Sequence, residues 1–337
     1  MVGARIVIAT ALLIGSACAP VSESRSPAVD EPQVSGALFV AGKFGNTLSK
    51  VDLADGEQVA TVESCANPHE LATSPDDRHV ALACYGGTTV DIFRTSDLSK
   101  VKSIELGENA RPHGIVWHVN GNLYATAEGR QSVFTIRDPL GRAEPLEFAT
   151  GQRGSHMLAV SPDGLHAWTT DLGDKTVTRV DLVTRRSPTS ATIGEEPEGI
   201  ALSPDGETLW VSARGSDMAF ALDPQTLEKV KDVPVGDFPL RIVLRPQGDY
   251  AVTSDLADGA LSVIDTATGA KVRTIAVSSR DEAEARSQVT ILFSPDGERI
   301  YVAETTANTI AEVDFASGKV LRRLPGTGGG DGIAIIE

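Results

Sequence analysis

The chain of 337 residues has few aromatic side chains, few cysteines and little positive charge. Aromatic residues make up 5% of it, three cysteines are present, and 46 acidic residues outnumber 30 basic ones, which gives a formal net charge of -16. An acidic chain without a basic stripe has no nonspecific hold on phosphate backbones, so a nucleic-acid partner is not expected. The motifs C-x-x-C-H and G-x-S-x-G are also missing, which argues against covalent haem attachment and against a nucleophile-elbow serine hydrolase.

Long apolar runs are lacking as well. The run IVIATALLIG (6–15) follows Arg5 and precedes SACAP, and it is too short to cross a hydrocarbon layer of about 30 Å. This order is typical of an export signal. Two cleavage patterns stay open: a lipobox that ends at Cys18, with Gly15 in place of the usual aliphatic residue, and ordinary cleavage in the small-residue segment 17–19.

We predict a signal peptide of the lipoprotein type over 1–18, lipidated at Cys18, followed by a flexible polar tether over 19–36. The protein is then expected to be exported to the periplasm or the cell exterior. It would touch the membrane only through its lipid anchor.

From residue 37 onward the chain is a repeat built on the unit P-x-G-I-A-x-S-P-D-G. The units begin every 42–44 residues, with one interval of 49, at Pro68, Pro112, Ser155, Pro197, Pro239, Gln288 and Gly330. Each unit predicts a first strand, a Pro-Asp-Gly turn and three further short strands. Four antiparallel strands in a period of about 42 residues are the pattern of a β-propeller blade.

The two ends of the chain complete one another. Residues 37–64 supply only the later strands of a unit, and 331–337 supply only a first strand. We therefore predict an all-β fold over 37–337, a seven-bladed propeller whose C-terminal strand closes the ring by joining the N-terminal blade. The insertion 278–288 explains the long interval and is predicted to be a surface loop or a single helical turn.

The units SPDGETLWVSARGSDMAFALDPQTLEKV and SPDGERIYVAETTANTIAEVDFASGKV resemble those of the YVTN-repeat β-propellers, a bacterial and archaeal group that includes the YncE-type exported proteins. The resemblance covers residues 37–337. It is specific for the fold but says little about the activity, because this superfamily includes lactonases, lyases, binding proteins and surface proteins.

Evidence for the function must therefore be sought at the positions where the sequence departs from the repeat. The second residues of the seven units are His69, His113, His156, Glu198, Leu240, Val289 and Asp331. The third position adds Glu70 and Arg241. Because the first strand of a blade lines the central channel, these side chains are expected along one mouth of it. The last residues of the second strands, among them Asp171, Asp255 and Glu304, are expected at the same mouth, which would make it acidic and rich in imidazole.

Three interpretations of this pattern stay open. Imidazoles of His69, His113 and His156 with the carboxylate of Glu198 suit a divalent transition metal. Alternatively, His113, His156 and Glu198 act as acid and base on an ester or lactone while Arg241 stabilises an oxyanion. In the third, the histidines only cap backbone groups, since each lies two residues before Leu71, Ile115 or Leu158 and so points to the same side as that apolar residue, between blades.

Cys84 is expected to end the strand that pairs with the one opening at Pro68, and Cys65 lies just ahead of that opening, so an exported chain favours their pairing as a disulfide. The sequence thus predicts an exported, monomeric propeller that binds a small molecule or metal ion at one channel mouth, as a binding or scaffold protein that can also meet a protein partner on a propeller face. The alternative is a metal-dependent lactonase-type hydrolase or a lyase resembling streptogramin lyase.

Overall fold

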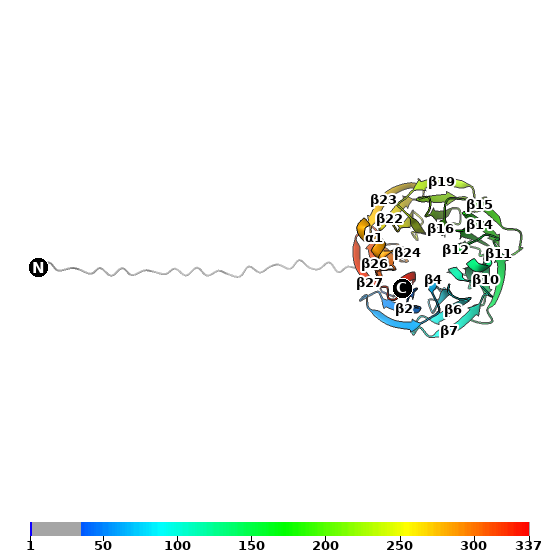
Figure 1. Ribbon diagram of the computed structural model, residues 1–337, viewed down its shortest axis with the longest axis horizontal. Coiled ribbons are helices and arrows are strands. Elements are labelled where there is room, and N and C mark those ends of the chain that lie inside the picture. Colours follow the sequence, from blue (N-terminus) through cyan, green and yellow to red (C-terminus); the bar gives the residue numbers. More distant parts are fainter. Residues whose placement is uncertain (2–34, 337) are drawn as a thin grey trace. The chain divides into compact units, whose positions relative to one another are not determined.

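The seven-bladed ring predicted from the repeats is the fold of this chain. The computed structural model describes Met1 and residues 35–336, so the predicted signal segment, Cys18 and nearly all of the predicted tether lie outside the described part. Seven separate four-stranded antiparallel sheets follow one another around the ring (Figure 1). Among residues 35–336, no helix has the length and hydropathy needed to span a membrane.

Six blades are continuous in sequence and one is shared by the two ends of the chain. The shared blade consists of β28 (Gly330–Ile336), β1 (Ala37–Gly42), β2 (Thr47–Asp52) and β3 (Gln58–Glu63). The next three blades are β4 (Pro68–Thr73), β5 (His79–Cys84), β6 (Thr89–Arg94) and β7 (Lys100–Glu105); β8 (Pro112–Trp117), β9 (Leu123–Ala127), β10 (Ser132–Arg137) and β11 (Glu144–Ala149); and β12 (Ser155–Val160), β13 (His166–Asp171), β14 (Thr176–Asp181) and β15 (Thr189–Thr192). The last three are β16 (Pro197–Leu202), β17 (Leu209–Ala213), β18 (Met218–Leu222) and β19 (Lys229–Pro234); β20 (Pro239–Leu244), β21 (Tyr250–Asp255), β22 (Ala260–Asp265) and β23 (Ala270–Ala276); and β24 (Gln288–Phe293), β25 (Arg299–Glu304), β26 (Thr309–Asp314) and β27 (Val320–Pro325).

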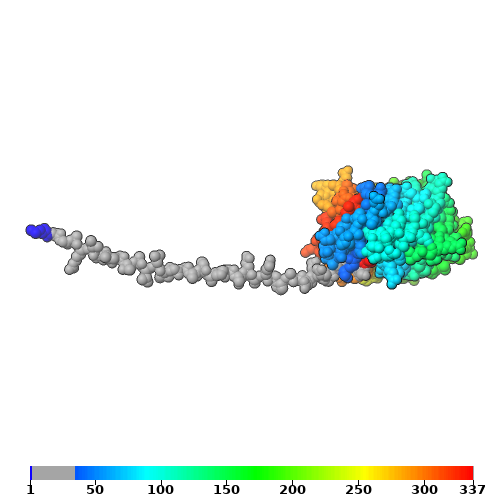
Figure 2. All heavy atoms as spheres, turned by 90° about the horizontal axis from the view of Figure 1, so that it is seen from below, coloured from blue at the N-terminus to red at the C-terminus, as the bar shows by residue number. Residues whose placement is uncertain are grey.

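The ring closes because β28 pairs antiparallel with β1, with Ala37 opposite Ile336 and Val40 opposite Ile333. The innermost strands β4, β8, β12, β16, β20, β24 and β28 each contact the next one around the ring. In the side view of Figure 2, the blades seen along the rim follow in chain order from blue through cyan to green. Apolar clusters lie between neighbouring blades, for example where Leu38 and Val40 pack against Tyr301 and Ile310. Burial of these interfaces is the main stabilising contribution to the ring.

The Ser-Pro-Asp-Gly segments form the turns after the inner strands. In all three of them, and in the related Ser-Pro-Asp-Asp segment at 74–77, the serine hydroxyl donates a hydrogen bond to the aspartate two residues later, as Ser203 does to Asp205 at 2.5 Å. The same hydroxyl accepts a backbone N–H from the start of the next strand. These aspartates are therefore turn residues. The inserted segment contains one short helix, α1 (Arg280–Arg286), which begins after Ser279.

Each inner strand begins directly after a residue with a left-handed backbone. These seven residues have φ between 48° and 77° and are Asn67, Arg111, Gly154, Glu196, Phe238, Ser287 and Gly329. A left-handed residue turns the chain sharply into the channel. The inner strands also approach one another closely there, because a Cβ on Gly332 would lie 2.0 Å from the carbonyl oxygen of His69. All seven blades thus present the first residues of their inner strands at one end of the channel.

Candidate functional site

One cavity of about 390 Å³ lies at this end of the channel, and we call it the mouth cavity. All seven second residues of the inner strands line it. The complete lining is Lys43, Asn67, His69, Tyr85, His113, His156, Glu198, Arg214, Phe238, Leu240, Arg241, Leu256, Val289 and Asp331. The second position of the repeat, where the sequence departs most from a plain blade, is therefore the position that shapes the cavity.

A β-bulge explains why the histidines reach the cavity. In the first blade after the shared one, Pro68 pairs with Cys84 and Leu71 pairs with Leu82, so His69 and Glu70 lie in a register shift between them. The other six inner strands have a shift at the same place. A bulge redirects side chains and commonly occurs beside functional sites. The simple alternation that would point these histidines between blades does not hold through it.

The second register of acidic residues does not reach the cavity. Asp171 accepts hydrogen bonds from Ser155 and three threonines, with the hydroxyl of Thr178 at 2.6 Å. Asp255 accepts from Ser262 at 2.6 Å and from a threonine on its own strand. Burial is the main influence on both carboxyls, raising the pKa of Asp171 and raising the pKa of Asp255 to about 6. Glu304 pairs with Arg323 at 2.9 Å. These three carboxylates join strands within the sheets.

The residue one position later reaches the mouth instead. Lys43, Tyr85, Arg214 and Leu256 each follow the second strand of a blade directly, and each lines the mouth cavity. Glu128 occupies the same place after β9, in a short 3-10 turn (Glu128–Arg130). Successive side chains of a strand point to opposite faces, so an error of one position exchanges cavity residues for sheet residues. The mouth also holds arginine and lysine, and is not the acidic funnel expected from sequence.

The three histidines form a row with Tyr85. Ring centroids of His69 and His113 are 4.7 Å apart, those of His113 and His156 are 3.7 Å apart, and Tyr85 lies 4.4 Å from His69. Burial lowers the pKa of His69 to about 4, which the carboxylate of Asp331 only partly opposes. Burial and then the neighbouring His156 and His69 lower the pKa of His113 well below its usual range. Two of the three imidazoles are therefore neutral at pH 7.

His156 differs because it lies between two carboxylates. Its Nδ1 is 2.5 Å from Oε1 of Glu128, and its Nε2 is 3.5 Å from Oε1 of Glu198. Burial by itself would lower the pKa of His156, but the hydrogen bonds to these two glutamates raise it overall. The hydroxyl of Tyr85 donates to Oε2 of Glu128 at 2.8 Å and itself accepts a hydrogen bond from Arg111. Burial and the charge of Glu128 raise the pKa of Tyr85 to about 12.

Arg241 is the buried cation at the centre of the site. It is 5% exposed, and its guanidinium donates to Oε1 of Glu198 and to Oε1 of Glu70, both at 2.7 Å. Arg214 donates to the other oxygen of Glu198 at 2.5 Å. Burial alone would raise the pKa of Glu198, but the hydrogen bond to His156, the charge of His156 and the two arginines lower it to about 2. Glu198 therefore stays ionised.

Six of the nine predicted ligand-binding residues come together in this one network, namely His69, Glu70, His113, His156, Glu198 and Arg241. Four residues that sequence reasoning missed join them: Lys43, Tyr85, Glu128 and Arg214. The signal that could have located these four is the same repeat register read one residue later.

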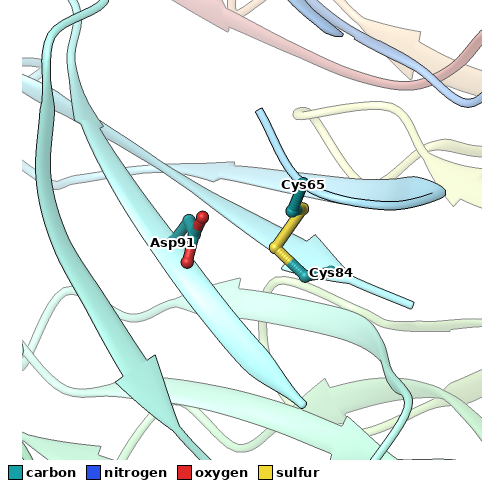
Figure 3. A group of neighbouring side chains, drawn as sticks. All are labelled: Cys65, Cys84 and Asp91. Atoms are coloured by element: carbon teal, nitrogen blue, oxygen red, sulfur yellow. A yellow bond between two sulfur atoms is a disulfide. The ribbon is translucent and has the colours of Figure 1, made fainter. Parts of the chain in front are cut away.

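Two groups of side chains have the spacing for a metal ion within residues 35–336. One consists of His113, Glu128 and His156, whose donor atoms lie within 4.8 Å of one another. The other consists of Cys65, Cys84 and Asp91, but the two sulfurs are joined in a disulfide with a Cα–Cα distance of 5.7 Å (Figure 3). Asp91 accepts hydrogen bonds from Lys100 and Ser103. The second group is therefore a structural link between the segment before β4 and the end of β5.

A family model described as "Lactonase, 7-bladed beta-propeller" matches residues 45–274, about two thirds of the chain. The chain belongs to this lactonase propeller family. The match runs from the N-terminal blade into β23 and includes every histidine of the mouth cavity. A search of curated protein sequences returned no match.

Solved structures agree on the propeller fold at low sequence identity. Hydrazine synthase of Kuenenia stuttgartiensis is 18% identical with a TM-score of 0.68, and the alignment covers 83% of this chain and 93% of the other. A streptogramin B lyase is 15% identical with a TM-score of 0.65, covering 76% and 82%. Apo AztD from Citrobacter koseri is 16% identical with a TM-score of 0.64, covering 90% and 98%. At such identities the likeness concerns the fold alone.

Proposed function

We propose that this lactonase-family propeller binds a small molecule with an apolar part and a polar, oxygen-bearing part. The observation that carries the proposal is the division of the mouth cavity into two walls. Phe238, Leu240, Leu256 and Val289 form an apolar wall from the β20 and β24 blades. The histidine row comes from β4, β8 and β12, on the other side of the ring. An apolar surface with a few convergent polar groups is typical of a small-molecule site.

The polar wall suits an oxygen acceptor on the ligand. His156 lies between Glu128 and Glu198, whose hydrogen bonds raise its pKa and favour its protonated form, and Arg214 and Lys43 add further donors at the cavity. A ligand carbonyl or carboxylate would accept hydrogen bonds there, while its hydrocarbon part covers Leu240 and Leu256. Charge-assisted hydrogen bonds of this kind are stronger than neutral ones.

A second candidate function is catalysis on the same ligand class, as a lactonase-type hydrolase or a lyase. The observation that favours it is the raised pKa of His156, because an imidazolium next to a bound ester or lactone can protonate the leaving oxygen. Streptogramin B lyase is one of the proteins with the same fold. In this mechanism Glu128 orients His156 through Nδ1, and Arg241 keeps Glu198 ionised beside Nε2.

Export as a periplasmic lipoprotein, and the finer placement among YncE-type propellers, remain part of this proposal. The apolar run at 6–15 and the SPDG units are the features that support them. A binding or scaffold role on an exported, tethered ring is consistent with a ligand site at one mouth and with no covalent-catalysis motif in the sequence.

The test is to identify and titrate the ligand. Small molecules extracted from natively exported protein are identified by mass spectrometry, and affinities for a panel of lactones and aryl esters are measured by calorimetry. Leu256→Gln, at the apolar wall, should weaken binding about tenfold or more, because burying a leucine contributes about 1.5–3 kcal/mol. Val119→Gln, at a side chain that is 82% exposed, is the matched control and should leave affinity unchanged.

Turnover of the bound compound separates the two candidates. Product formation that falls in His156→Gln while affinity holds would favour the enzyme. Binding without turnover would favour the binding protein. The proposal would be contradicted if no compound of the panel bound and no small molecule were extracted from the protein. It would also be contradicted if the ligand bound equally well to Leu256→Gln.

A further inference from the structure

Three donor side chains meet beside the mouth cavity, and two of them, His113 and His156, line it. His113 is the second residue of β8, His156 is the second residue of β12, and Glu128 begins the 3-10 turn between β9 and β10. Their donor atoms lie within 4.8 Å of one another. His113 is 2% exposed and His156 is 8% exposed, while the side chain of Glu128 is 11% exposed. Two adjacent blades thus hold two imidazoles and one carboxylate at one point of the mouth.

His113 supplies an independent sign that a ligand belongs here. Its Nδ1 is buried and has no hydrogen-bond partner within the described part of the chain. Leaving a buried polar atom unpaired costs about 1–3 kcal/mol, so such atoms in native proteins call for an explanation. A metal ion bound through Nδ1 of His113 would remove this cost, because the metal takes the place of the missing partner.

The other two donors already have the supporting contacts that metal ligands need. Oε1 of Glu128 lies 2.5 Å from Nδ1 of His156, and Oε2 of Glu128 accepts a hydrogen bond from Tyr85. Nε2 of His156 lies 3.5 Å from Glu198. Ligating carboxylates and imidazoles are commonly held in this way by a hydrogen bond on the atom that does not bind the metal. With metal–ligand distances of about 2.0–2.2 Å, the 2.5 Å pair needs to open by only about 1 Å.

Glu198 and His69 do not fit the metal shell that the sequence pattern suggested. Both oxygens of Glu198 are engaged by arginines, at 2.7 Å from Arg241 and 2.5 Å from Arg214. A divalent ion on the same oxygens would lie next to two fixed positive charges. His69 has its Nδ1 at 3.0 Å from the carbonyl oxygen of Asn67, and it is not one of the three clustered donors.

We propose that His113, His156 and Glu128 bind one divalent transition metal ion, such as Zn²⁺ or Co²⁺, with its fourth position open to the mouth cavity. Two histidines, one glutamate and an open position form a known donor set for such ions. In this arrangement Glu198 and Tyr85 are positioning residues, which act through His156 and Glu128 respectively. The site does not depend on the organic ligand proposed above, since metal binding is measured without that ligand.

The experiment uses untagged, full-length protein with Cys18→Ser, so that no added histidines and no free Cys18 take up metal. No reductant is added, and a thiol assay verifies that the Cys65–Cys84 disulfide is intact, because freed thiols beside Asp91 would form a second site. Zn²⁺ and Co²⁺ affinities are measured by competition with a chromophoric chelator. Elemental analysis gives the metal-to-protein ratio.

We expect about one ion per chain. Glu128→Gln and His113→Phe should each weaken binding at least 100-fold. Tyr85→Phe, which removes the hydroxyl that donates to Glu128 and accepts from Arg111, should weaken it about 10–100-fold. His69→Phe, which keeps the ring row, is the matched control and should change affinity less than threefold. Thermal unfolding of each metal-free variant verifies folding, and Glu128→Gln keeps the shape of the side chain.

Three results would overturn the assignment. The first is the absence of stoichiometric Zn²⁺ or Co²⁺ in the folded, oxidised protein. The second is binding that is insensitive to both Glu128→Gln and His113→Phe. The third is loss of binding in Glu198→Gln and His69→Phe but not in Glu128→Gln. That result would mean that the metal ligands are those predicted from the sequence, with Glu198 and His69 in place of Glu128.

Discussion

Replacing Arg241 by methionine should destabilise the ring strongly, because this guanidinium is the buried counterion of two carboxylates, one from the neighbouring blade and one from across the ring. Its contacts at 2.7 Å reach Glu198 on β16 and Glu70 on β4. All three side chains are 8% exposed or less. Burial by itself would lower the pKa of Arg241, but Glu70, Glu198 and Asp331 raise it overall, so the side chain stays charged.

The magnitude follows from what the substitution leaves behind. Glu198 keeps Arg214 as a partner, whereas no second cation pairs with Glu70 among the contacts of residues 35–336. Removing one member of a buried ion pair typically costs about 3–5 kcal/mol, since an uncompensated charge remains. Arg78→Met is the matched control, because Arg78 is 80% exposed and lies 4.0 Å from Asp76. Exposed pairs of this kind contribute about 0–1 kcal/mol.

The assay is guanidinium-induced unfolding followed by tryptophan fluorescence at pH 7, with Arg241→Met, Glu70→Gln and the double variant. We expect the double variant to be more stable than the sum of the single effects implies, by about 0.5–3 kcal/mol, as is usual for residues in direct contact. A cost below about 1 kcal/mol for Arg241→Met, or strictly additive effects in the cycle, would refute the idea that this pair holds opposite parts of the mouth together.

Two further predictions concern pH and the disulfide. Because burial lowers the pKa of His69 to about 4 from the ordinary 6.5, its stabilising effect is complete above pH 6.5 and is lost as the pH falls toward 4, by up to about 3 kcal/mol. His69→Gln should therefore lose less stability than the native chain between pH 7 and pH 4 in the same unfolding assay, and equal losses would count against a neutral, buried imidazole. Cys65 and Cys84 are 19 residues apart, so loop-closure entropy predicts that reduction, or a Cys65→Ala/Cys84→Ala variant, costs about 3 kcal/mol. An unchanged unfolding midpoint after verified reduction would contradict this.

The blade architecture was predictable because it depends on local, repeated chemistry. Each Ser-Pro-Asp-Gly turn needs only a hydroxyl, a proline, a carboxylate and a glycine in sequence, as in Ser294 to Gly297, and its spacing reports one blade. The shared blade was also predictable, since 37–64 lacks a first strand and 331–337 supplies one. The seven second-position residues could be assigned to one mouth for the same reason: equivalent places in a repeat occupy equivalent places in the ring.

The contacts within the mouth were not predictable, because they depend on backbone irregularity and on distance along the chain. Simple alternation points His69 away from the channel, and only the bulge between Pro68 and Leu71 turns it inward. Arg241 meets carboxylates 43 and 171 residues away, so no local pattern pairs them.

Asp171 shows that a shift of one position along a strand changes whether a side chain faces the sheet or the cavity. Asp171 faces Thr178 and Ser155 inside its sheet, while Arg214, one place later in its own blade, lines the cavity. The sign of the local charge changes with that step, from an expected acidic mouth to one where arginines hold Glu198 ionised. Because those arginines engage Glu198, the carboxylate available to a metal is Glu128, in the turn after β9. The chemistry at the mouth is thus determined by residues just beyond the second strands as much as by the histidines themselves.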